Sequence, residues 1–120
     1  MSDYLTLEAL SDARCESIQI GTEPLDASRT ATLLKLLPDW SLDGSSIVRT
    51  VRFKNYHKTI EFVNDVARVA HDQDHHPDME VGYNRCVVKF STHDVRGLSE
   101  KDFICAAGVE RVVQRHRHKL

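Results

Sequence analysis

The sequence predicts an α+β protein of one domain, in which three helices pack on one face of a four-stranded, mainly antiparallel sheet. Three observations support this fold class. The chain has 120 residues, 41% of them hydrophobic, which suits one compact domain. Helical and strand-like hydrophobic patterns follow in the order helix, hairpin, helix, hairpin, helix. A long helix joins the two hairpins, which favours antiparallel pairing with the helices on one side.

The chain divides into an N-terminal arm, residues 1–24, and a folded domain, residues 25–120. The arm shows no sustained hydrophobic period, and it ends in turn-prone residues that include Gly21 and Pro24. We therefore expect the structural core to begin near Leu25.

The first helix and the first hairpin follow the arm. Asp26 is a favourable N-cap, and leucines at helical spacing continue to Pro38, which ends the helix. Asp43 and Gly44 then form a turn between two short strands. The second strand alternates, so that one of its faces carries Ile47, Val51 and Phe53.

A central helix is predicted from about Tyr56 to Gln73. It begins after the second strand and ends shortly before a proline. Its buried stripe is expected to consist of hydrophobic residues at helical spacing: Tyr56, Ile60, Val63, Ala67 and Ala70, widened by Phe62, Val66 and Val69.

A second hairpin and a last helix complete the domain. Pro77 returns the chain to an extended path, and Tyr83 with Asn84 forms the turn between the third and fourth strands. Ser99, followed three residues later by Asp102, is a variant capping box that begins the last helix. The expected inward residues are Cys86, Val88 and Phe90 of the fourth strand, and Phe103, Ala106, Ala107 and Val113 of the last helix.

Charge and cysteine content narrow the classes of function. The formal net charge is -2, so no global basic field favours nucleic acid or a membrane as the main ligand. Residues 1–14 lack the basic start and apolar core of a secretory signal, and we expect a cytoplasmic protein. Cys15, Cys86 and Cys105 include no C-x-x-C pair, and we expect all three to be reduced and structural.

The stretch HDQDHHPD carries the candidate site. His71 lies in the last turn of the predicted central helix, and Pro77 restricts the backbone of His76 to extended conformations. The hairpin aligns the start of the third strand with the end of the fourth, so we expect His93 to face His75 and His76. Imidazoles titrate near neutral pH. Two of them suit a reaction that gives a proton to a leaving hydroxyl while another proton is removed nearby.

Two other interpretations of these residues remain open. Three histidines with an open fourth position also describe a catalytic zinc site, although adjacent histidines rarely point at one ion. Histidines and aspartates are also common at a solvated helix end, where His71 suits the helix dipole. The remaining histidines, His57, His116 and His118, are expected to be solvated.

The segment HDQDHHPDMEVGYNRCVVKFSTHDVRGLSEKD resembles the signature of the pterin-4a-carbinolamine dehydratase family. The signature combines a polar residue, His-His-Pro after three further positions, an aromatic residue, a histidine and an aspartate. In this chain these are His71, His75, His76, Pro77, Tyr83, His93 and Asp102. The resemblance extends back through LLPDWSLDG and implies a sheet with helices on one side, assembled into homodimers or homotetramers.

The resemblance also implies an activity. A 4a-hydroxytetrahydrobiopterin dehydratase is a hydro-lyase that converts 4a-hydroxytetrahydropterin to quinonoid dihydropterin and water. This step recycles the pterin of an aromatic amino acid hydroxylase, which would be a functional partner. Pterin is then the substrate, and neither a cofactor nor a metal is expected.

The resemblance carries over to His75, His76 and His93 as the active-site histidines, and we assign roles to the individual residues as a hypothesis. His75 and His93 would act as general acid and base in either order, and His76 would bind and orient the pterin. Pro77 and Tyr83 would contact the pterin. Supporting roles fall to His71 and Asp102, with Asp72 or Asp74 as further candidates for a carboxylate beside His75, and Asp102 is chiefly a helix-capping acid.

A partner-binding function is the alternative. Some relatives of this family act as coactivators or assembly factors rather than chiefly as enzymes. The tail RVVQRHRHKL concentrates positive charge, which suits an acidic partner, although placement at a helix C-terminus explains it more simply. A binding-only relative would be free to lose the histidines, and their presence here favours the enzyme. The basic residues are Arg111, Arg115, Arg117 and Lys119.

Overall fold

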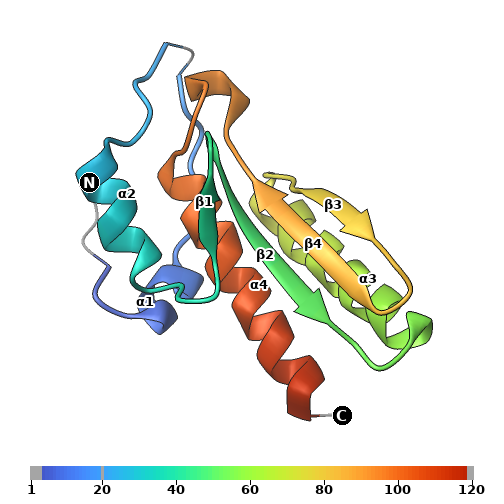
Figure 1. The fold of residues 1–120 in the computed structure, drawn as a ribbon. Helices are drawn as coiled ribbons and strands as arrows, with labels where there is room; N and C mark the ends of the chain where they lie inside the picture. Colours follow the sequence, from blue (N-terminus) through green and yellow to red (C-terminus); the bar gives the residue numbers. More distant parts are fainter. Residues whose placement is uncertain (1–3, 20, 119–120) are drawn as a thin grey trace.

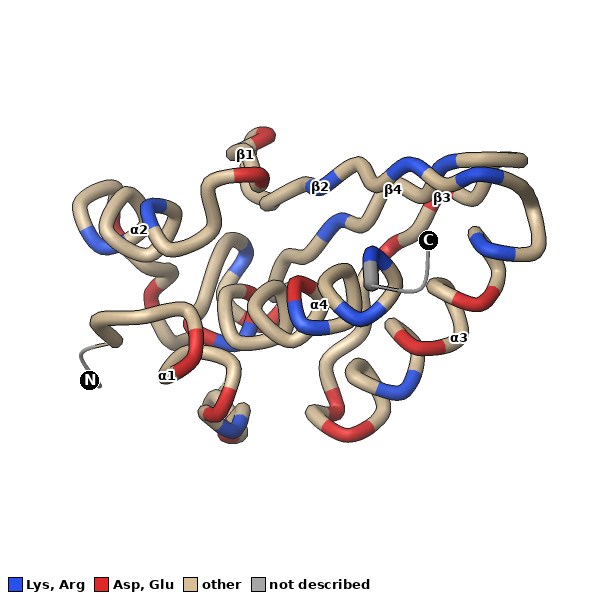
Figure 2. The backbone as a smooth tube through the Cα atoms, turned by 90° about the horizontal axis from the view of Figure 1, so that it is seen from below, with Lys and Arg blue, Asp and Glu red and all other residues tan. Residues whose placement is uncertain are grey.

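The computed structural model describes residues 4–19 and 21–118. Its elements are α1 (Leu7–Asp12), α2 (Ala27–Leu34), β1 (Ser41–Asp43), β2 (Ser46–Arg52), α3 (Tyr56–Gln73), β3 (Asp78–Val81), β4 (Arg85–Phe90), the 3-10 helix η1 (His93–Val95) and α4 (Glu100–His118). The strands form one antiparallel sheet in the order β1-β2-β4-β3. Helices α3 and α4 cover one face of this sheet (Figures 1 and 2), which confirms the predicted fold class.

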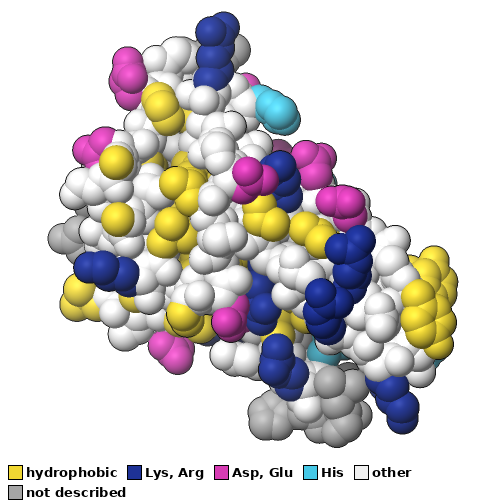
Figure 3. All heavy atoms as spheres, viewed as in Figure 1, with side chains coloured by type: hydrophobic (Ala, Val, Ile, Leu, Met, Phe, Trp, Pro, Cys, Tyr) yellow, Lys and Arg dark blue, Asp and Glu magenta, His cyan; other side chains and the backbone are white. Residues whose placement is uncertain are grey.

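Alternation along β2 and β4 separates a buried face of the sheet from an exposed one. Ile47 pairs with Phe90, and Val51 pairs with Cys86. All four side chains are buried in the core. The opposite face is polar, and Lys and Arg side chains gather over β2 and β4 (Figure 3). The predicted inward residues of both strands are therefore confirmed, and Phe53, just beyond β2, is half-buried and packs against the core.

Helix α3 has the predicted bounds, and its buried stripe was predicted in part, since Phe62, Val66 and Ala70 are buried as expected. The buried residues are Thr59, Phe62, Val66 and Ala70, whereas Tyr56 and Ala67 are exposed. The buried stripe also includes a polar residue, Thr59, that hydrophobicity does not identify. The Thr59 hydroxyl donates to the Asn55 carbonyl oxygen or to the Tyr83 carbonyl oxygen, each 2.9 Å away, and this contact satisfies it in the core.

A glycine allows α3 and α4 to approach each other closely. A Cβ atom at Gly108 would lie 2.8 Å from Cγ1 of Val69, which is shorter than real carbon contacts. The predicted inner residues of α4 are all buried: Phe103, Ala106, Ala107 and Val113. The two helices therefore form one continuous layer beneath the sheet.

The N-terminal arm contains a short helix that periodicity did not reveal. The Thr6 hydroxyl caps α1 by accepting from the amide of Ala9 at 3.1 Å, and Leu10 is fully buried against α4. Asp12 receives Arg111 of α4 in an ion pair of 2.7 Å. Helix α1 has only 6 residues, too few to show a hydrophobic period.

His116 is buried, so the prediction that it is solvated was wrong. Its Nε2 atom lies 2.8 Å from Oδ2 of Asp65 on α3, and its ring meets Phe53 and Phe62 edge-on. α4 extends far enough over α3 to enclose this position. His57 is 82% exposed, as predicted. The side chain of His118 and all of Lys119 fall outside the described residues.

Within the described part of the chain, each helix is too short or too polar to cross a membrane.

Candidate active site

The candidate site lies at one end of the sheet, where four segments meet (Figure 1). These are the end of α3, the start of β3, the end of β4 and the start of α4. Asp78 pairs with Lys89, so the chain that enters β3 runs beside the chain that leaves β4. The predicted hairpin alignment is therefore correct, and it brings the His75 and His76 segment beside the segment that leads to His93.

The end of α3 fixes the backbone position of His75. Asp74 adopts a left-handed conformation with φ of 50°, which aspartate tolerates better than most residues. The amide of His75 then donates to the carbonyl oxygen of Ala70 at 3.1 Å and closes the helix. His75 thus lies beyond the helix, and its spacing from His71 is not a helical i, i+4 spacing. His71, Asp72 and Asp74 are all exposed.

Asp102 supplies the carboxylate that contacts His75. Its Oδ1 atom lies 2.6 Å from Nε2 of His75. Its Oδ2 atom accepts from the Thr92 hydroxyl at 2.8 Å and from the amide of Ser99 at 3.0 Å. The contact with Ser99 is the predicted capping interaction at the start of α4. Asp102 therefore caps the helix and also holds a histidine, which the capping pattern did not reveal.

Burial makes these contacts important. Asp102 has a relative exposure of 0%, and a buried carboxylate is costly unless hydrogen bonds satisfy it. The oxygens of Thr92 and Ser99 are 2.7 Å apart. Because the Thr92 hydroxyl donates its proton to Asp102, the Ser99 hydroxyl is the donor to Thr92. The carboxylate is thus held by a chain of hydrogen bonds in a protected position.

The loop that carries His93 is tied to the same carboxylate. Thr92 and Gly97 form an isolated bridge, in which the Thr92 amide donates to the Gly97 carbonyl oxygen at 2.8 Å. His93 begins η1 inside this loop, and its side chain is exposed. Since Thr92 precedes His93 directly, Asp102 joins the two histidine-bearing segments. No sequence signal distinguished Thr92 from other polar residues.

The ring of His75 is fixed by a stacking contact with its flat face as well as by the contact of its Nε2 atom with Asp102. It stacks on Phe90 with the ring centroids 6.0 Å apart and an angle of 14° between the planes. The side chain of His75 is 11% exposed, whereas His76 is exposed and Pro77 is half-buried. His75 is therefore the most buried of the three histidines, and His76 borders it on the surface.

Tyr83 lies away from the histidines. It occupies the turn between β3 and β4, at the opposite end of this hairpin from Pro77. Its ring is 66% exposed and stacks on Tyr56 with the centroids 6.5 Å apart. The predicted contact between Tyr83 and the pterin stays a prediction that the geometry of one chain does not support.

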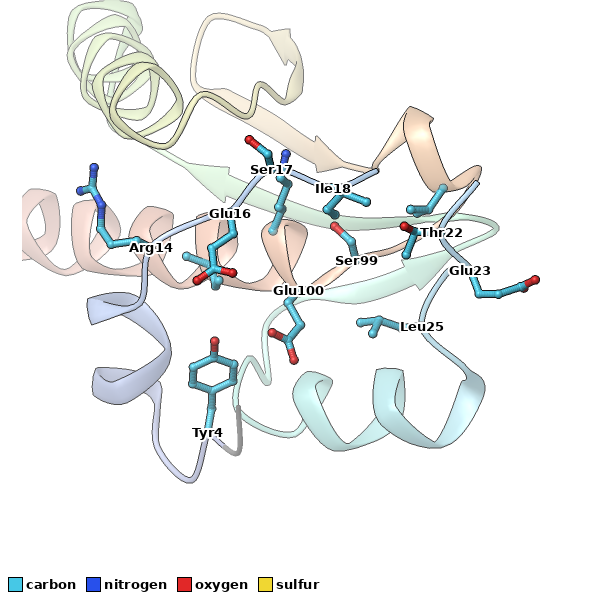
Figure 4. A pocket seen from close by; sticks show the side chains of 13 residues that line it. Tyr4, Arg14, Glu16, Ser17, Ile18, Thr22, Glu23, Leu25, Ser99 and Glu100 are labelled. Atoms are coloured by element: carbon cyan, nitrogen blue, oxygen red, sulfur yellow. The ribbon is translucent and has the colours of Figure 1, made fainter. Parts of the chain in front are cut away.

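A cavity of about 430 Å³ lies between the arm and the start of α4 (Figure 4). Tyr4, Arg14 and Glu16 line it from the arm, Ser99 lines it from the position just before α4, and Lys101 lines it from α4. Its lining contains no histidine, so it is distinct from the candidate site even though both include Ser99. Among the described residues, no three histidine, cysteine or carboxylate side chains are grouped to hold a metal ion.

Comparison with known proteins gives consistent results. Residues 23–112 match the family model described as Pterin 4 alpha carbinolamine dehydratase. A protein of Nitrosomonas eutropha is 50% identical over 105 residues, which cover 87% of this chain and 93% of that protein. A protein of Stenotrophomonas maltophilia is 53% identical over 100 residues, 82% of this chain and 86% of that protein. The names of both describe them provisionally as pterin-4-alpha-carbinolamine dehydratases.

A solved structure shares the fold. The crystal structure of a transcriptional coactivator/pterin dehydratase from Brucella melitensis superposes with a TM-score of 0.71 at 30% sequence identity. The match covers 75% of this chain and 98% of that chain.

Proposed function

Because the chain belongs to the pterin-4a-carbinolamine dehydratase family, we propose that it dehydrates a 4a-hydroxytetrahydropterin to the quinonoid dihydropterin by histidine acid-base catalysis. The observation that carries this proposal is the contact of 2.6 Å between His75 and the buried Asp102. The proposal includes a cytoplasmic homo-oligomer that recycles pterin for an aromatic amino acid hydroxylase.

The contact with Asp102 suits His75 to the role of general base. A carboxylate at Nε2 favours the tautomer with its proton on Nε2, which leaves the lone pair of Nδ1 for the substrate. The carboxylate also stabilises the imidazolium that forms when Nδ1 accepts a proton. His75 would therefore remove the proton that the pterin ring loses.

His93 would then act as the general acid. Dehydration breaks the bond between C4a and the hydroxyl oxygen, and hydroxide is a poor leaving group unless it is protonated. A proton from His93 converts it to water, while the ring proton passes to His75. A positioned acid or base typically contributes about 10²- to 10⁴-fold in rate. The bond from Thr92 to Asp102 helps to hold the two histidine segments at a fixed separation.

The exposed residues beside His75 would bind the pterin ring. His76 offers hydrogen bonds to the polar edge of the ring, and Pro77 offers a flat apolar surface next to it. Pro77 also keeps the backbone of His76 extended, so the imidazole needs little ordering when substrate binds.

A decay assay tests the proposed activity. The substrate, 4a-hydroxytetrahydropterin, is generated in solution, and its loss is followed with and without the purified full-length protein in the presence of a chelator. We expect the protein to accelerate the loss. A rate equal to that of buffer alone would contradict the proposal, and activity restored only by zinc would favour a metal site in place of acid-base catalysis.

Partner binding is a second candidate, because the Brucella melitensis neighbour is named as a coactivator as well as a dehydratase. Part of the basic tail is already used within this chain, since Arg111 pairs with Asp12 at 2.7 Å. Salt-dependent binding of a nucleic acid or protein partner by a variant lacking His75, His76 and His93 would support this candidate.

A further inference from the structure

We propose that Cys15 and Cys105 form a peroxide-sensitive dithiol whose oxidation to a disulfide fastens the N-terminal arm to α4 behind His75. The two Sγ atoms are 3.8 Å apart, although 90 positions separate the residues in sequence. Cys15 is half-buried on the arm after α1, and Cys105 is fully buried in α4. Neither residue belongs to the proposed acid-base machinery, so the inference does not depend on the proposed function.

Hydrogen bonds on the arm hold Cys15 over α4. The backbone amide of Cys15 donates to Oε1 of Gln73 at 2.8 Å. The side-chain nitrogen of Gln73 donates in turn to the carbonyl oxygen of Ala13 at 3.3 Å. The Cys15 thiol also lies 3.7 Å from the carbonyl oxygen of Lys101. The end of α3 therefore binds the arm in a definite position, and the contact between the two sulfur atoms follows from that position.

The pKa values of the two thiols are shifted in opposite directions, as is expected of a nucleophilic cysteine and of the resolving cysteine that attacks it. The hydrogen bond with Cys105 lowers the pKa of Cys15, assisted by the charges of Lys101 and Arg14, against burial and the charge of Asp102. The same hydrogen bond, together with burial, raises the pKa of Cys105. Cys15 is also the more exposed of the two, and it is therefore assigned the role of the reactive thiolate.

A cavity lies beside the half-buried Cys15. The cavity of about 430 Å³ is lined by Arg14 and Glu16, the chain neighbours of Cys15 (Figure 4). It is also lined by Lys101 and Ile104, which come shortly before Cys105 on α4. Neither cysteine lines the cavity itself, but Cys15 is only half-buried beside it, and the exposed part of this thiol is where a molecule as small as hydrogen peroxide would react.

The reaction balances with hydrogen peroxide as the oxidant. The Cys15 thiolate attacks one peroxide oxygen, which forms an S–O bond and breaks the O–O bond, and the released hydroxide takes a proton to become water. The Cys105 sulfur then attacks the Cys15 sulfur. This step forms the S–S bond, breaks the S–O bond and releases a second water with the proton of Cys105. Two thiols are oxidised, and one peroxide is reduced to two waters.

Disulfide formation requires only a local movement. The sulfur atoms must approach from 3.8 Å to a bonding distance of about 2.0 Å. Cys15 lies on the loop that follows α1, and this loop can shift toward Cys105 on α4. The Cys105 thiol is also 3.9 Å from the carbonyl oxygen of His75, so the new bond would lie directly behind the candidate site.

Thiol mapping after peroxide treatment tests this proposal. The full-length protein and its Cys15→Ala, Cys105→Ala and Cys86→Ala variants are treated with hydrogen peroxide, alkylated and analysed by intact mass and peptide mapping. The matched control is Cys86, because it is buried on β4 and burial raises its pKa to about 11. We expect an intramolecular disulfide between residues 15 and 105 in the wild type and in Cys86→Ala.

The same samples give a second measurement. The disulfide closes a long loop, so the oxidised wild type should unfold at a higher temperature, and a dithiol reductant should reverse the shift. Cys15→Ala should show neither the disulfide nor the shift, and it stays informative if Cys105→Ala fails to fold. A sulfenic acid that persists on Cys15, a disulfide between two chains, or equal oxidation of Cys86 would overturn the proposal.

Discussion

The Nε2 atom of His75 lies 2.6 Å from Oδ1 of Asp102, a carboxylate that is fully buried at the start of α4. The other oxygen of Asp102 accepts from Thr92, the residue before His93. One carboxylate thus contacts both segments that carry the proposed acid and base. An acid that caps α4 is therefore also positioned to act in the proposed chemistry.

Replacement of Asp102 by asparagine should lower kcat by about 10²-fold or more while the protein stays folded. The amide oxygen can still accept from Ser99, but a neutral side chain no longer stabilises a charged His75. Steady-state kinetics and thermal unfolding measure the two effects. The matched control is Asp72→Asn, which changes an exposed carboxylate at the end of α3. A loss of activity in the control alone would show that the wrong carboxylate has been assigned.

Replacement of Thr92 by valine should destabilise the fold by about 1 to 3 kcal/mol. Valine has a similar shape, but Asp102 loses one donor and the Ser99 hydroxyl loses its acceptor. Urea unfolding measures the change. Thr50→Val is the control, because Thr50 is exposed on β2. Equal effects of the two substitutions would mean that the buried hydrogen-bond chain contributes nothing specific.

Replacement of His116 by alanine should lower stability by about 1 to 3 kcal/mol and leave dehydration unchanged. The variant removes the contacts with Phe53 and Phe62 and leaves Asp65 without the histidine. His57→Ala, at an exposed position of α3, should change neither quantity. If His116→Ala stopped turnover in folded protein, the assignment of this second histidine-aspartate pair to structure would be wrong.

Ionisation of the buried Cys86 thiol should lower the stability of the protein at alkaline pH. Burial raises its pKa from 9.0 to about 11 in the folded state. Below pH 9 the thiol is protonated in both the folded and the unfolded chain, so its ionisation does not yet reduce stability. As the pH rises to 11, the thiol ionises first in the unfolded chain, and the free energy of unfolding falls by up to about 3 kcal/mol. Urea unfolding between pH 8 and 11 should show a smaller decline for Cys86→Ala, and identical declines would refute this cause.

Local signals in the sequence accounted for much of the fold. The bounds of α3 followed from its periodicity and from the proline beyond it, and the start of α4 followed from Ser99 and Asp102. The pairing of Asp78 with Lys89 followed from the position of the hairpin turn. Each of these features depends on residues that are close together in the chain, so the sequence alone was sufficient.

The remaining features depend on packing between distant residues. The contact of Asp102 with His75 spans 27 positions, and the pattern of a capping acid is the same with or without it. Thr59 is buried because the turn at Tyr83 offers an acceptor, and His116 is buried because α4 crosses α3. Hydrophobicity along one segment carries no information about such partners.

The loss of 4a-hydroxytetrahydropterin in the presence of wild type, His75→Ala, His93→Ala and the exposed control His71→Ala tests the central claim most directly. With chelator present, we predict acceleration by the wild type and by His71→Ala, and rates at least 10²-fold lower for the other two variants. Wild-type turnover by folded His75→Ala and His93→Ala proteins would contradict the claim.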